Sequence, residues 1–106
     1  MLELDCYFIK GVLVIKMIGS LNSNTINKFN KETLDLVECG FTNMLFNLND
    51  ICEIDSNGYN SLLNNCRKIE KSGRKALFFG IDRKMFDSNN EYNIHDDINV
   101  LNYFKI

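Results

Sequence analysis

The residues most capable of chemistry lie in the run Asp55-Ser56-Asn57-Gly58-Tyr59, near the middle of the chain. The side chain of Asp55 or Ser56 can accept hydrogen bonds from the free amides of a helix that begins there. Gly58 has no side chain, so another part of the backbone can approach the first turn. Taken alone, this run predicts a capped helix that follows a loop.

Two kinds of enzyme site are excluded at this junction. The loop has no glycine-rich cradle and no neighbouring lysine, so it is not a nucleotide P-loop. The Gly-x-Ser-x-Gly elbow of hydrolases is absent because position 54 is Ile54, and no histidine lies near Ser56 in the sequence.

Cysteine and histidine are the other candidates for metal binding or nucleophilic chemistry. The cysteines form no C-x-x-C pair, and the single histidine, His95, precedes two aspartates. Because zinc sites need closely spaced ligands, we predict no metal site and place His95 in a solvated turn. The four cysteines are predicted to be ordinary buried thiols and not a disulfide framework: Cys6, Cys39, Cys52 and Cys66.

The composition indicates one globular domain over residues 1–106. Hydrophobic residues make up 45% of the chain and charged residues 25%, which supports a core and excludes a disordered tail. The net charge of −2 provides no broad basic field, so direct binding of nucleic acid is not expected. The longest apolar run, residues 12–15, is too short for a membrane span, and Glu3 and Asp5 replace the bases of a signal peptide. We therefore expect a cytoplasmic protein.

Alternating and β-branched apolar residues predict four or five strands. The pattern places strands at residues 4–9, 12–18, 44–48 and 76–81, with a further short strand at residues 92–95. Lys10-Gly11 predicts a tight hairpin turn, and Gly19 is predicted to end the second strand. A polar loop is expected at residues 49–55.

Helical spacing of apolar residues predicts two main helices. The first covers residues 24–38, and a side chain among residues 22–24 is expected to cap it. The second carries one apolar stripe and ends at residues 72–73; the stripe consists of Tyr59, Leu62, Leu63, Cys66 and Ile69. A cluster of cations at residues 67–75 suits the dipole at the end of this helix. A short helix at residues 82–86 and a closing helix after Asp96 are also predicted.

Strands that alternate with helices predict an α/β fold with a mostly parallel sheet and right-handed crossovers. In such a sheet, functional residues gather in the loops beyond the carboxyl ends of the strands. Three loops meet this condition, at residues 19–24, 49–58 and 80–83.

The order and spacing of these elements resemble the STAS family, the anti-sigma factor antagonists. In that family a strand ends in Gly-Glu-Leu-Asp, a helix and a strand follow, and Asp-Ser-x-Gly begins a second helix. The corresponding residues here are Gly19-Ser20-Leu21-Asn22 and Asp55-Ser56-Asn57-Gly58, so both carboxylates of the first motif are absent. The resemblance covers residues 12–82. It implies one STAS-like domain, with helices chiefly on one face of a mostly parallel sheet of four to five strands.

The resemblance also implies a partner switch that is not an enzyme. In the family, an anti-sigma factor that is also a serine kinase phosphorylates the serine after the aspartate. The unmodified protein binds this kinase, and the phosphorylated protein releases it. By position, Ser56 is the implied phosphoacceptor, and the implied partner-binding residues are Ser20, Asn22, Asp55, Asn57, Gly58 and Tyr59. Such a protein needs no cofactor of its own and is expected to be a monomer or a weak homo-oligomer.

Two alternatives remain open. The first is a scaffold or ligand-sensing module of the same fold whose serine is not phosphorylated. The second is an enzyme of unrecognised type, for example one that uses a cysteine. A deep pocket lined by Cys52 or Cys66, with a thiol of lowered pKa, would favour the enzyme.

Overall fold

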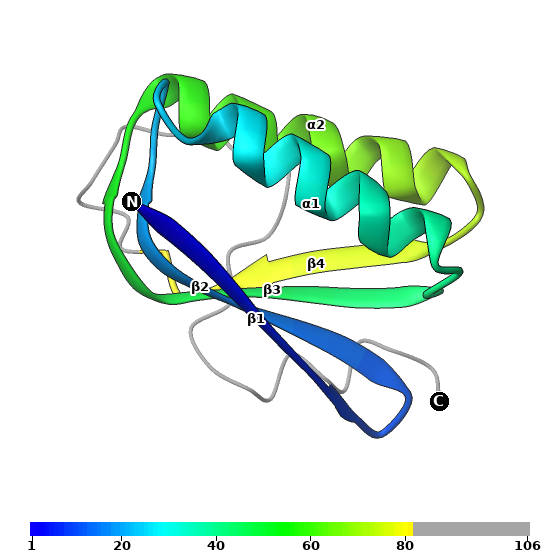
Figure 1. The fold of residues 1–106 in the computed structure, drawn as a ribbon. Helices are drawn as coiled ribbons and strands as arrows, with labels where there is room; N and C mark the ends of the chain where they lie inside the picture. Colours follow the sequence, from blue (N-terminus) through cyan, green and yellow to red (C-terminus); the bar gives the residue numbers. More distant parts are fainter. Residues whose placement is uncertain (82–106) are drawn as a thin grey trace.

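The computed structural model describes residues 1–81, which form a four-stranded sheet and two helices (Figure 1). In chain order the elements are β1 (Leu2–Ile9), β2 (Val12–Leu21), α1 (Ile26–Glu38), β3 (Asn43–Ile54), α2 (Ser56–Lys71) and β4 (Lys75–Phe79). The strands lie in the order β1-β2-β3-β4; β1 and β2 are antiparallel, and the other two pairs are parallel. Both helices cover the same face of the sheet (Figure 1). The predicted α/β class is confirmed; the elements predicted at residues 82–86, at 92–95 and after Asp96 lie outside the described residues.

The turn between β1 and β2 has the predicted form. Lys10 and Gly11 both have positive φ, 50° and 79°, as the tightest hairpin turns require. Glycine adopts such angles without steric cost, so the dipeptide sets the register in which Ile9 pairs with Val12.

Two strands extend well past their predicted ends. β2 continues through Gly19 to Leu21, and β3 continues to Ile54, so most of the expected polar loop at residues 49–55 is strand. The reason is long-range pairing, because Ser20 lies beside Glu53 and Leu21 beside Ile54. Such pairing satisfies the hydrogen-bonding groups of the backbone whatever the side chains are. An alternation of apolar and polar residues therefore does not reveal this part of the strands.

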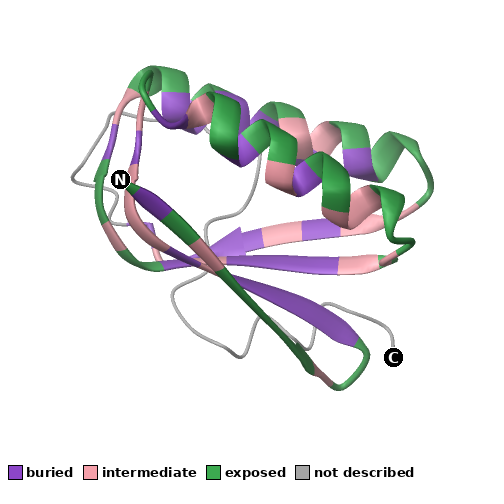
Figure 2. Cartoon of the chain, in the orientation of Figure 1, coloured by how far each residue is buried: buried purple, intermediate pink, exposed green. Residues whose placement is uncertain are grey.

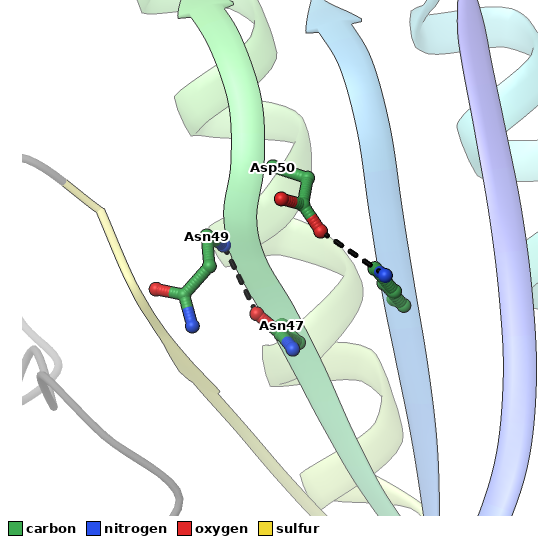
Figure 3. Close-up of polar contacts among 4 residues, drawn as sticks. Asn47, Asn49 and Asp50 are labelled. Carbon is green, nitrogen blue, oxygen red and sulfur yellow. Dashed lines mark hydrogen bonds and ion pairs between the residues drawn. The ribbon is translucent and has the colours of Figure 1, made fainter.

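A local irregularity lies where β3 passes into its polar half (Figure 3). The backbone N–H of Asn49 donates to Asn47 Oδ1 at 3.0 Å, and the Asp50 carboxylate forms an ion pair with Lys16 on β2 at 3.4 Å. The β2–β3 register shifts between Lys16 and Ile18 at the same level. The hydrogen bond lies within β3, and the ion pair joins β3 to β2 beside the register shift.

The main core lies between the sheet and the two helices (Figure 2). The rings of Phe29 and Phe46 pack edge to face, with their centroids 5.7 Å apart. The rings of Tyr59 and Phe78 pack in the same way, with their centroids 6.5 Å apart. The predicted stripe on α2 is confirmed, since all five of its residues are buried. On α1, Leu34 is 54% exposed although it shares the helical spacing of the apolar residues there.

A second, smaller cluster lies on the other face of the sheet. It consists of Val12, Val14, Leu45 and Phe79, which alternate along their strands with residues of the main core. Phe78 and Phe79, neighbours on β4, are therefore both buried, with one ring on each face of the sheet.

The prediction of four buried cysteines was wrong for three of them. Only Cys66 is buried; Cys6 lies on the outer strand β1, Cys39 directly follows α1, and Cys52 lies where β3 has passed its last pairing with β4. These three thiols are exposed because no neighbouring element covers them at those positions in the fold. Burial raises the pKa of the Cys66 thiol, which is the opposite of the lowered pKa that a catalytic cysteine needs.

Within residues 1–81, neither helix combines the length and apolar composition needed to cross a membrane.

Candidate functional site

The candidate site lies where β2 and β3 end side by side. Leu21 pairs with Ile54 as the last residues of the two strands, and α1 and α2 start a few residues further on. The segment between β2 and α1 and the segment between β3 and α2 therefore lie at the same end of the molecule (Figure 1). This is the carboxyl edge of the parallel strands, where the sequence predicts functional residues.

Asp55 joins the two segments. As the N-cap of α2, it accepts from the Gly58 backbone N–H through Oδ1 at 2.7 Å. Its Oδ2 accepts from the backbone N–H and the hydroxyl of Ser23, at 3.2 and 3.3 Å. These hydrogen bonds hold the pKa of Asp55 below its usual value, and the bond from the Gly58 N–H has the largest effect. The carboxylate is therefore charged at neutral pH and fixes one segment to the other.

Ser56 is the first residue of α2, and its side chain is exposed. Its hydroxyl forms no hydrogen bond with any other residue in the part of the chain that the structure describes. Asn57, also exposed, donates from Nδ2 to the Ser23 hydroxyl at 2.7 Å. The Ser56 oxygen is thus open to a second molecule, while its neighbours on both sides are held in place.

Ser20 and Asn22 lie at the same edge, on the β2 side. Asn22 donates from Nδ2 to Glu53 Oε1 at 3.1 Å, and Ser20 Oγ lies 3.6 Å from the Cys52 thiol. Cys52 in turn donates to the Gly19 carbonyl at 3.2 Å. The structure therefore groups Ser20, Asn22, Asp55, Ser56 and Asn57, as the sequence predicts.

The start of α1 differs from the prediction. The helix begins at Ile26, two residues later than expected, with Thr25 as N-cap and no capping bond from its side chain. Thr25 Oγ1 instead donates to the Ser20 carbonyl at 2.9 Å, and Asn22 Oδ1 accepts from the Asn24 N–H. The short polar side chains thus order the segment before the helix, because turn-forming bonds compete with the cap.

Gly58 and Tyr59 lie beneath this surface. A Cβ at Gly58 would collide with the Leu21 carbonyl, which also accepts from the Asp55 N–H at 3.2 Å. Tyr59 is 8% exposed and packs in the main core. These two residues, which the resemblance also places in the partner-binding set, are therefore buried and lie below the exposed side chains of the site.

Sequence reasoning missed Ser23 and Glu53 as members of the site. Each contacts its partner across more than thirty residues of sequence, so no local pattern signals the contact. Of the third predicted loop, the structure describes Gly80 and Ile81, and Gly80 lies against Asn49.

Several solved structures are similar to this fold. TM1081 of Thermotoga maritima, described as a candidate anti-sigma factor antagonist, has 18% identity and a TM-score of 0.79, with 94% of this chain and 92% of that chain covered. The anti-sigma factor antagonist SpoIIAA of Bacillus, in its unphosphorylated form, has 16% identity and a TM-score of 0.63, covering 80% and 77%. An anti-sigma factor antagonist from Mycobacterium paratuberculosis has 14% identity and a TM-score of 0.69, covering 78% and 70%.

Comparison with curated protein sequences gives no match. The family model described as the STAS domain, however, matches residues 3–104, which is nearly the whole chain. The sheet order, the two helices on one face and the capped start of α2 agree with that match. The chain therefore belongs to the STAS domain family.

Proposed function

We propose that this protein is an anti-sigma factor antagonist that acts by partner switching. In the proposed cycle it binds an anti-sigma factor that is also a serine kinase, and phosphorylation of Ser56 causes release. The observation that carries the proposal is the exposed Ser56 hydroxyl at the first residue of α2, next to the fixed Asp55 carboxylate. SpoIIAA, which shares the fold, has both an unphosphorylated and a phosphorylated form.

The physical basis of release is the added charge. A phosphoserine carries about −1.5 to −2 charges at neutral pH, and it would stand beside Asp55 and near Glu53. A partner that docks on this surface would have to desolvate those charges together. A loss of about 2 to 3 kcal/mol in binding would weaken the complex by roughly 30- to 150-fold, which is enough to reverse partner choice.

The fold itself can tolerate the phosphate. The start of α2 presents backbone N–H groups and the positive end of the helix dipole, both of which favour a nearby anion. In this proposal the protein is a cytoplasmic binding protein with no catalytic activity and no cofactor, and the ATP and magnesium are those of the kinase.

A second candidate is a scaffold or ligand-sensing STAS module. It is favoured by Ser20 and Asn22, which stand where the family motif has carboxylates. Because Asn22 is bonded to Glu53, that part of the surface presents an amide and a partly engaged carboxylate where two free acids are expected.

The first experiment is phosphorylation with ATP and a candidate anti-sigma factor kinase, followed by mass spectrometry. We expect one added phosphate on the wild type and none on Ser56→Ala. The matched control is Ser72→Ala, which removes an exposed serine at the other end of α2 and should leave phosphorylation unchanged. Absence of phosphate on Ser56 with every such kinase would favour the scaffold.

The second experiment measures binding of the kinase to Ser56→Asp. Asn64→Asp is the control, since it adds the same charge at an exposed position two turns further along α2. We expect Ser56→Asp to bind at least tenfold more weakly and Asn64→Asp to bind as the wild type does. Equal binding of all three proteins would contradict a charge switch at Ser56.

A further inference from the structure

A groove of about 250 Å³ runs between α1 and α2, away from the docking surface proposed above. It is lined by the middle and last turns of α1 and by the second half of α2, whereas Ser56 lies at the first residue of α2. The two helices lie side by side there (Figure 1). Its apolar wall is formed by Leu34, Val37 and Ile69.

Three hydrogen-bond donors in the lining lack partners within residues 1–81. Thr33 is 1% exposed, and its Oγ1 forms no hydrogen bond. Asn30 Oδ1 accepts from Ser61 Oγ and Asn65 Nδ2, both at 2.7 Å, which leaves the Asn30 amide nitrogen as a donor. The Lys68 ammonium forms no ion pair among these residues.

The Thr33 hydroxyl is the most informative of the three. A buried hydroxyl without a partner is unfavourable, and native structures contain few of them. Threonine in a helix divides its population between two χ1 rotamers, so rotation can exchange the methyl and hydroxyl positions. A molecule in the groove that offers an acceptor would give this hydroxyl its missing partner.

We propose that the groove binds a small molecule with an anionic, acceptor-bearing head and an apolar body. Of the lining side chains one is cationic and none is acidic, so the local charge favours an anion. The Lys68 ammonium and the Asn30 amide nitrogen can only donate, and the Thr33 hydroxyl can donate as well as accept, so an acceptor-bearing head such as a carboxylate can satisfy all three groups. The volume corresponds to about eight water molecules at roughly 30 Å³ each, so the apolar body is limited to a short chain or one ring.

The probe is hexanoate, with hexylammonium and 1-hexanol as matched ligands that change only the head. Each is titrated into the isolated protein, and amide chemical shifts are followed by NMR. We expect saturable shifts at Thr33, Val37 and Ile69 with hexanoate, and much weaker effects with the other two ligands. No saturable shift with hexanoate, or equal shifts with hexylammonium, would overturn the proposal.

Two variants test the donors. Thr33→Val keeps the shape and removes the hydroxyl, so it should weaken hexanoate binding by about fivefold while leaving the thermal stability equal or higher. Lys68→Gln should weaken binding to a similar degree, and Lys71→Gln, on the same helix but outside the groove, should not. Unchanged affinity in both Thr33→Val and Lys68→Gln would contradict the assignment. Because none of these measurements involves a kinase, their failure is distinct from failure of the switch at Ser56.

Discussion

Asp55 shows how much of the site depends on one side chain. Its two oxygens accept from α2 on one side and from Ser23 on the other, so they couple the helix start to the segment before α1. A longer or uncharged side chain would not satisfy both sets of donors equally. The family motif places aspartate before the phosphoacceptor, and the structure supplies a geometric reason for it.

The lowered pKa of Asp55 predicts a pH dependence. Because the folded-state pKa lies below the ordinary value, its contribution to stability is present above about pH 4 and is lost as the pH falls through the folded pKa. Asp55→Asn should therefore lower the melting temperature at pH 7, and the difference from wild type should shrink toward pH 3. Thermal melts of both proteins across this range are the measurement.

The control is Asp35→Asn, which removes an exposed aspartate of α1 for which no side-chain hydrogen bond is seen among residues 1–81. It should change the melting temperature less than Asp55→Asn at pH 7. A difference between wild type and Asp55→Asn that stays constant from pH 7 to pH 3 would show that the carboxylate charge is not the cause.

A second prediction concerns the close approach at Gly58. Since a Cβ there would meet the Leu21 carbonyl, Gly58→Ala should lower the free energy of unfolding by about 1 to 3 kcal/mol, despite the better helix propensity of alanine. The comparison is Asn64→Ala, an exposed site on the same helix that should be neutral or slightly stabilising. Urea denaturation measures both, and equal stability of Gly58→Ala and wild type would contradict the close approach.

At the scale of elements, the pairing of α1 with α2 depends on polar contacts as well as on the core. Asn30 Oδ1 accepts from one side chain of each of two successive turns of α2, Ser61 and Asn65. Asn30→Ala should lower the free energy of unfolding by about 1 kcal/mol, since one part-buried and one exposed hydrogen bond are lost. Asn27→Ala, exposed one turn earlier, is the control and should have little effect, because alanine favours a helix at least as well as asparagine does. Equal stability changes in the two variants would contradict a contribution from the hydrogen bonds between the helices.

The strands and helices also determine which thiols react. Cys39 and Cys52 are exposed, whereas Cys66 is buried on α2 and its pKa is raised by burial. The pKa of Cys6 is also raised, by partial burial and by the charges of Asp5 and Glu32. With a thiol reagent at pH 7, we expect rapid modification of Cys39 and Cys52, slower modification of Cys6, and modification of Cys66 only after unfolding. Mass spectrometry of the folded protein checks this order, and rapid labelling of Cys66 would contradict the packing of α2.

At the scale of the whole molecule, the proposed switch should act on binding and leave the fold intact. Ser56→Asp places a negative charge at the start of α2, which the helix dipole favours by about 0.3 to 1 kcal/mol. We therefore expect an unchanged circular dichroism spectrum and a melting temperature between about 0 and 5 °C above that of wild type. A large decrease would mean that any loss of partner binding in this variant reflects unfolding.

Much of the architecture could be predicted, because local patterns encode it. The β1–β2 turn follows from Lys10-Gly11, and the buried face of α2 follows from one apolar stripe. The true lengths of β2 and β3 could not be predicted, since polar residues such as Ser20, Asp50 and Glu53 interrupt the apolar pattern, and these ends are strand only because they pair with each other. Exposure of Leu34 and of three cysteines likewise depends on which neighbouring element covers each side chain, and the sequence pattern does not contain that information.

The order of elements over residues 1–81 and a helix cap at Asp55 or Ser56 could be determined from the sequence alone, because each depends on residues within one or two turns of one another. The structure was needed to show that Asp55 is the cap and that Ser56 is exposed. Only the tertiary structure decided that Ser23 and Glu53 complete the site, and that a groove with unpartnered donors lies between the helices. These features join residues about thirty positions apart. Such contacts form only when distant segments of the chain pack against each other, so the structural preferences of neighbouring residues do not predict them.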